Sequence, residues 1–158
     1  MNKEQIAIYT RRIAASNRSE LIVVLYDILD TYLQEAETAI VEQDWALAKE
    51  SLRRASQVVE HLKSDLDFKY EIATQLYPLY DFAQRAIAKS IYTRRAQGIE
   101  EAQRVLRPLA TVFAQVAQED SSDPIMQNTQ QIVAGYTYGK TNLTESTQDF
   151  DTSRGFLA

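Results

Sequence analysis

The sequence predicts an all-α protein, built as an antiparallel four-helix bundle with an N-terminal arm and a partly disordered C-terminal tail. Apolar residues recur at spacings of three and four from about residue 17 to residue 118, as they do on the buried face of a helix. With only 4 Gly and 3 Pro, the 158-residue chain is poor in residues that interrupt helices. We therefore expect one domain, with the arm over residues 1–16, the bundle over 17–118 and the tail over 119–158.

The first two bundle helices have clear start signals. Asn17 and Glu20 have the spacing of a capping box, which predicts a helix from there to about Gln43. Asp44 is a good N-cap for the second helix. The apolar stripe of the first helix comprises Ile22, Leu25, Leu29, Leu33, Ala36 and Ile40. The stripe of the second alternates spacings of four and three, as in a bundle seam, and comprises Ala48, Leu52, Ala55, Val59, Leu62 and Leu66.

The third helix is expected over residues 71–96 and the fourth from about Ile99 to Gln118. Gly98 between them suits a left-handed C-cap. Pro78 and Pro108 lie inside the two patterns, and each removes a backbone hydrogen bond, which predicts a kink or a break. The apolar stripe of the fourth helix comprises Ala102, Val105, Leu106, Leu109, Val112, Phe113 and Val116.

The stretch from Leu66 to Phe82 carries two apolar stripes instead of one. The first comprises Ile72, Leu76, Leu79 and Ala83, and the second comprises Ala73, Tyr77 and Tyr80. A surface helix needs a single apolar face, so a second face has to pack against something else. One interpretation is a central, well-buried helix with tyrosine hydroxyls at the rim. The other is a helix that lines a binding groove.

The two ends of the chain have different patterns. Residues 1–16 are polar with scattered apolar residues, which is compatible with a short helix or with an arm that docks on the bundle. Asp120 to Pro124 is a cluster of helix breakers, followed by a short helix expected near residues 125–134. Ile132 to Tyr138 is the most apolar part of the tail. This patch either covers an apolar groove on the bundle or stays in solvent.

Composition narrows the classes of function. The net charge of −5 argues against a nucleic-acid partner, and the absence of Cys rules out disulfides and thiolate chemistry. No segment has the roughly 20 apolar residues that a membrane span needs, and the N-terminus does not resemble a signal peptide, so we expect a cytoplasmic protein without membrane insertion. His61 is the single histidine, so no catalytic or metal-binding set can be assembled, and we expect neither enzymatic activity nor a cofactor.

One alternative rests on His61. Histidine phosphotransfer domains are also helical bundles with an exposed histidine on the second helix, followed at a short distance by Leu and Lys. His61-Leu62-Lys63 resembles that motif with Leu and Lys one residue too early. A structural or adaptor bundle that binds some other helix, or a second copy of itself, is the other alternative.

Two stretches resemble a known family. Glu20 to Asp27 resembles the first helix of the FliS family, the flagellin-specific export chaperones of bacterial flagellar type III secretion. Leu66-Asp67, Glu71-Ile72-Ala73, Leu76 and Leu79-Tyr80-Asp81 resemble the junction of that family's second and third helices. The resemblance runs from about Ile6 to Gln118.

This resemblance implies a specific function. The protein would bind the disordered C-terminal segment of flagellin, prevent its premature polymerisation and deliver it to a membrane protein of the flagellar export gate. The expected client groove comprises Leu62, Leu66, Tyr70, Ala73, Leu76, Tyr77 and Tyr80. In relatives, a tyrosine ahead of the first bundle helix helps to cover the empty groove and to dock on the gate, which assigns these roles to Ile6, Ile8 and Tyr9.

Overall fold

The computed structural model describes residues 1–126 of the chain, and within them it contains five α-helices. The helices are α1 (Lys3–Ala15), α2 (Arg18–Val41), α3 (Trp45–Ser64), α4 (Glu71–Thr93) and α5 (Gln97–Glu119). The prediction of an all-α bundle is confirmed. Of the tail helix expected near 125–134, only residues 125 and 126 are described, and they are not helical; the patch from Ile132 to Tyr138 lies outside the described residues.

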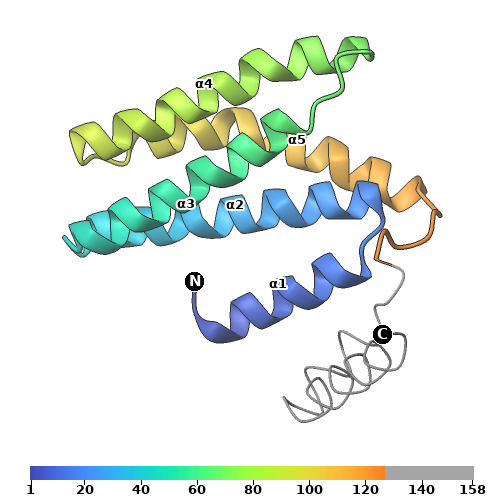
Figure 1. Cartoon of the computed structure of the whole chain (residues 1–158). Coiled ribbons are helices and arrows are strands. Elements are labelled where there is room, and N and C mark those ends of the chain that lie inside the picture. The colour runs from blue at the N-terminus through green and yellow to red at the C-terminus, as the bar shows by residue number, and fades with distance from the viewer. Residues whose placement is uncertain (127–158) are drawn as a thin grey trace, which may run out of the picture.

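Helices α2 to α5 pack in a closed ring, in which α2 contacts α3 and α5, and α4 contacts the same two helices (Figure 1). Polar contacts between neighbours set the antiparallel order. The ammonium of Lys63 lies 3.4 Å from the Asp81 carboxylate, while Glu60, one turn earlier, accepts a hydrogen bond from Gln84, one turn later. Lys89 pairs with Glu101 at 2.8 Å in the same manner between α4 and α5.

The predicted start signals of α2 and α3 are confirmed. The Asn17 side chain accepts a hydrogen bond from the Glu20 N–H at 2.8 Å, and the Glu20 carboxylate accepts one from the Asn17 N–H at 2.9 Å. The Asp44 carboxylate accepts from the N–H of Leu47 at 3.1 Å. These contacts join residues three positions apart, so they form as soon as the local backbone turns into a helix.

The prediction for the α4–α5 junction was wrong. Arg94, not Gly98, takes the left-handed conformation that ends α4, with φ of 56°. Gly98 lies inside α5, where a Cβ would overlap the carbonyl oxygen of Ala86 on α4. The glycine is therefore needed for close helix packing. Neither proline breaks its helix, because α4 continues through Pro78 and α5 through Pro108.

The buried faces differ in part from the predicted stripes. In α3, the stripe residues Ala48, Leu52, Ala55, Val59 and Leu62 are buried as predicted, and Leu66 is half-buried. In α2, Val24 and Tyr26 join the core, whereas Ile22 and Leu25 are only half-buried. In α5, Val112 and Val116 are about half exposed, because the helix has neighbours only on the side of Ala102 and Leu106.

The N-terminal arm is a helix that packs along α2 outside the ring (Figure 1). Asn2 and Gln5 form its capping box. The Tyr9 hydroxyl bonds to the Thr31 hydroxyl at 2.7 Å, and Arg12 pairs with Asp27 at 2.6 Å.

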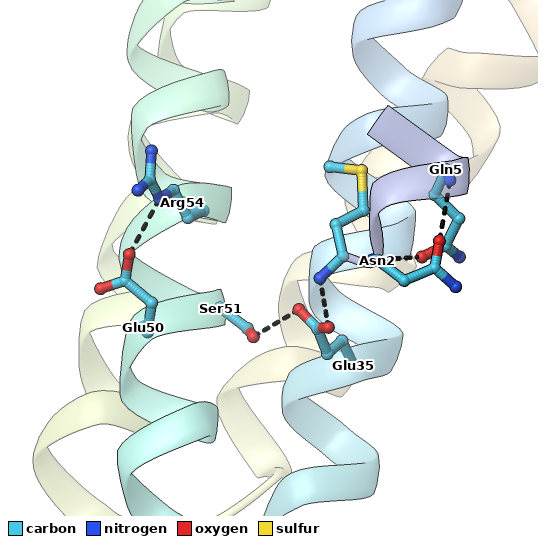
Figure 2. Close-up of polar contacts among 7 residues, drawn as sticks. Asn2, Gln5, Glu35, Glu50, Ser51 and Arg54 are labelled. Carbon is cyan, nitrogen blue, oxygen red and sulfur yellow. Dashed lines mark hydrogen bonds and ion pairs between the residues drawn. The ribbon is translucent and has the colours of Figure 1, made fainter. Parts of the chain in front are cut away.

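The start of the arm is tied to α2 and α3 through one carboxylate. Glu35 pairs with the N-terminal ammonium of Met1 and accepts a hydrogen bond at 2.7 Å from Ser51 on α3 (Figure 2). Partial burial raises the pKa of the Glu35 carboxyl, but the bonds from the ammonium and from Ser51 outweigh it, so the pKa lies below its ordinary value.

Candidate binding cavity at one end of the bundle

A cavity of about 310 Å³ lies where α2 and α4 begin and α3 ends. Six of the seven residues predicted for the client groove line it: Leu62, Leu66, Tyr70, Ala73, Leu76 and Tyr80. They come from two helices and the loop between them. The opposite wall is formed by the start of α2, with Leu21, Ile22 and Leu25, and by Phe113 of α5.

The predicted residues lie at different depths. Leu62, Ala73, Leu76 and Tyr80 are buried and form part of the core, so they can only be the floor of a site. Leu66 is half-buried. Tyr70 is 66% exposed and stands at the rim. Large effects on folding are therefore expected from the floor residues, while Tyr70 is free to contact another molecule.

A tyrosine pair closes the floor. The hydroxyls of Tyr26 and Tyr80 are 2.8 Å apart and bonded to each other, and the Tyr26 ring stacks on Phe113 with centroids 5.6 Å apart. Burial raises the pKa of both hydroxyls, so both are neutral at physiological pH. Because the two hydroxyls are buried and bonded to each other, the floor presents mainly apolar and aromatic surface.

In the structure, α4 has one buried row of residues with an exposed flank on each side, instead of the two predicted apolar stripes. The buried row comprises Ala73, Leu76, Tyr80, Ala83 and Ile87, which takes members from both stripes. Of the remaining members, Ile72 (58% exposed) and Leu79 lie on the flank toward α5, and Tyr77 lies on the flank toward α3. The buried row is centred between the two predicted stripes, so it takes the near members of each stripe and leaves the far members exposed.

Tyr77 does not line the cavity. Its ring packs against Phe68 at 5.8 Å between centroids, and the Lys63 ammonium lies 5.0 Å from the ring centroid. The same ammonium bonds to Gln84 at 2.9 Å. Tyr77 and Phe68, which is 58% exposed, thus form an aromatic shelf beside the cavity, on the α3 side.

The loop between α3 and α4 explains why this rim is exposed. Asp67 organises the loop, because its carboxylate accepts from the Lys69 N–H at 3.0 Å and its carbonyl accepts from the Tyr70 N–H at 3.1 Å. Tyr70 then takes the N-cap position of α4 without a side-chain cap bond. A polar N-cap would be the stabilising choice there, so the tyrosine leaves the start of α4 without that stabilisation and exposes its ring at the rim.

The arm residues contribute nothing to the lining of this cavity in the described structure. Tyr9 is held against α2 by its hydroxyl, while Ile6 and Ile8 are 48% and 47% exposed. The arm therefore presents two isoleucines to solvent on the outside of α2.

Other chemistry is sparse in residues 1–126. His61 is exposed on α3, and its neighbour Lys63 is engaged by α4. No group of three or more His, Cys, Asp or Glu residues in this range is placed to hold a metal ion. None of the five helices there is both long and apolar enough to cross a membrane.

Sequence reasoning missed one part of the cavity wall. After α5, the chain folds back and Ile125 joins the lining beside the start of α2. The breaker cluster from Asp120 to Pro124 predicted the end of the helix. No local pattern indicated where the chain would go next.

Comparisons with known proteins give one consistent result. The family model described as flagellar protein FliS matches residues 2–120. The flagellar secretion chaperone FliS of Salmonella typhimurium is 29% identical over 120 residues, which cover 74% of this chain and 88% of that relative.

Proposed function

This chain belongs to the FliS family of flagellar proteins, and we propose that it is a cytoplasmic export chaperone that binds the C-terminal segment of flagellin at the cavity end of the bundle. The observation that carries the proposal is the convergence of six predicted groove residues on one cavity. The similarity to a protein named as a flagellar secretion chaperone supports the same function.

The physical chemistry of the cavity end suits an extended apolar client. The floor is neutral and apolar, and exposed aromatic and aliphatic residues stand at its rim and beside it: Phe68, Tyr70, Ile72 and Tyr77. A cavity of about 310 Å³ takes a few side chains, so most of the contact area has to come from this surround. A disordered segment can reach both, because it folds on the surface that it binds.

The floor and the rim of the cavity would make different contacts with the bound segment. Apolar side chains of the client would enter the cavity over Leu76 and Tyr80, where both tyrosine hydroxyls are buried and bonded to each other. Tyr70 and Tyr77 would cover the client from the rim. Tyrosine suits this place because it supplies a large contact area with few rotatable bonds and tolerates water when no client is present.

Calorimetric titration of the full chain with the C-terminal segment of flagellin tests the proposal. Ile72→Asp places a charge at the cavity wall and should weaken binding at least about tenfold. The substitution is in the first turn of α4, where an acidic residue favours the helix, so the folding midpoint should be nearly unchanged.

Tyr92→Asp is the matched control, because Tyr92 is a 91% exposed apolar residue near the other end of the same helix. It should leave the affinity within about twofold, since a surface charge far from the interface contributes little. Equal losses in both variants, or none in either, would rule out the cavity end as the client site.

Delivery to the export gate is assigned to the arm. Ile6 and Ile8 stay exposed while Tyr9 fixes α1 on α2, so they can contact a gate protein while the cavity holds a client. Ile6→Ser with Ile8→Ser should therefore abolish binding to the cytoplasmic part of the gate protein. Flagellin affinity should be retained, and its loss would contradict this division of roles.

A further inference from the structure

The seven residues that follow α5, Asp120 to Met126, form a strap that is tied to the α1–α2 junction. Ser16 accepts a hydrogen bond through its carbonyl from the Ile125 N–H at 3.1 Å. The Ser19 hydroxyl donates to the Asp120 carboxylate, which also accepts from the Ser122 N–H at 3.0 Å. The bonds from Ser16 and Ser19 each span more than a hundred positions of sequence and fix the direction in which the chain leaves α5.

Asn17 binds the strap through its side-chain amide nitrogen, which takes no part in capping α2. Its side-chain oxygen caps α2, as described above. Its amide nitrogen donates to the carbonyls of Asp120 and Ser122, at 3.2 and 3.3 Å. The residue is 3% exposed, so these bonds are shielded from water. Serine and asparagine cap helices equally well, but serine has no amide to hold both carbonyls.

The part of the strap farthest from α5 lies at the cavity. Ile125, which lies three residues beyond Ser122, lines the cavity beside Arg18 and Leu21 at the start of α2. This isoleucine is thus the one apolar side chain of the strap that contributes to the wall. A client that follows the α2 wall has to displace it.

We propose that the strap is an intramolecular competitor, in which Ile125 covers the α2 side of the cavity in the free protein and is displaced by the client. The proposal rests on the proposed function for the identity of that client. Because Asn17 and Ser16 hold the strap at the edge of the site, Ile125 competes at a high effective concentration. Release of the strap would then accompany loading.

Two full-length test variants, each with its own control variant, separate the role of the strap from helix capping and from folding. Asn17→Ser removes the amide donor and keeps the cap, and Asn2→Ser makes the same change at the α1 cap, where the amide holds nothing in the described structure. Ile125→Ser removes the cover itself from a 55% exposed position, so it should not affect folding. Val41→Ser, at a 77% exposed position outside the cavity, is its control.

Amide hydrogen exchange tests the strap without any client. In the free wild-type protein, the Ile125 amide should exchange at least about tenfold more slowly than in an unfolded chain. Asn17→Ser should remove this protection, and Asn2→Ser should keep it. Exchange of the Ile125 amide at the unfolded rate in the wild-type protein would overturn the proposal.

Titration with the flagellin C-terminal segment and with an apolar fluorescent dye tests the competition. Asn17→Ser and Ile125→Ser should each bind the dye more strongly and bind flagellin at least about threefold tighter than the controls, because less of the protein is in the covered state. Flagellin binding with the same affinity in all four variants would overturn the competition. Increased dye binding without any flagellin binding would support the cover and instead contradict flagellin as the client.

Discussion

The two ends of the bundle are built from the same helices and are packed very differently. At the end where α4 meets α5, the helices pack closely, with Ser90, Ile99 and Ala102 fully buried. At the other end, the same four helices leave a cavity of about 310 Å³ with exposed aromatic residues around it. Close packing at one end is thus combined with an apolar surface left open at the other, and under the proposed function the packed end supplies the stability while the open end binds the client.

Small side chains make the packed end possible. Gly98 brings the backbone of α5 against Ala86 of α4, and the Ser90 hydroxyl accepts from the Ile99 N–H at 3.0 Å. The start of α5 has no side-chain cap of its own, so Ser90 on the neighbouring helix satisfies one of its free N–H groups. At the open end, large residues such as Tyr70 and Phe68 stand where a tight turn would place small ones.

The largest expected effect is at the packed end. Gly98→Ala should lower the free energy of unfolding by about 3 kcal/mol, because its Cβ overlaps a backbone carbonyl that cannot rotate away. Urea unfolding measures the loss. Flagellin affinity per folded molecule should stay the same, and a parallel loss of affinity would mean that the two ends are not independent.

An intermediate effect is expected at the floor of the cavity, where the two regions meet. Tyr80→Phe leaves the buried Tyr26 hydroxyl without its partner and should cost about 2 kcal/mol of stability. Tyr26→Phe should cost a similar amount. The double variant should cost less than the sum, because neither hydroxyl is then left unpaired. Additive losses would show that the bond between the two tyrosines contributes nothing.

The smallest expected effect is at the arm, outside both ends. The pKa of Glu35 is lowered in the folded protein, so its contribution to stability is present above its ordinary value of 4.5 and is lost as the pH falls through the lower folded value. Glu35→Gln should cost less than about 1 kcal/mol at pH 7. This cost, measured by urea unfolding over a series of pH values, should be constant well above pH 4.5 and decline as the pH falls below it. A cost that stays the same from neutral to strongly acidic pH would contradict an ionic role.

Local signals in the sequence predicted the parts of the fold that depend on near neighbours. The caps at Asn17 and Asp44 follow from contacts three positions apart, and the α3 stripe follows from a regular seam. The end of α4 could not be predicted in the same way. Arg94 takes the left-handed turn, while Gly98 is needed where α5 packs on Ala86 of α4, and that packing is visible only in three dimensions.

The same distinction between local and distant contacts decides which parts of the cavity could be predicted. Residues of the α3–α4 junction were predicted together because the family resemblance lies there. The strap was missed because Asn17 and Asp120 are 103 positions apart and neither residue type marks a partner. The exposure of Val112 and Val116 was also missed, since an apolar stripe does not reveal which part of its width the neighbouring helices cover.

The most direct test of the account is to map bound flagellin on the full chain by methyl chemical shifts in solution. The account predicts that the C-terminal segment of flagellin shifts the methyl groups of Leu66, Ile72 and Ile125 most, because they line the cavity. The methyl groups of Ile87 and Ile99, fully buried toward the packed end, should move little. Shifts concentrated around Ile87 and Ile99, with Ile72 and Ile125 unchanged, would contradict the assignment of function to the open end.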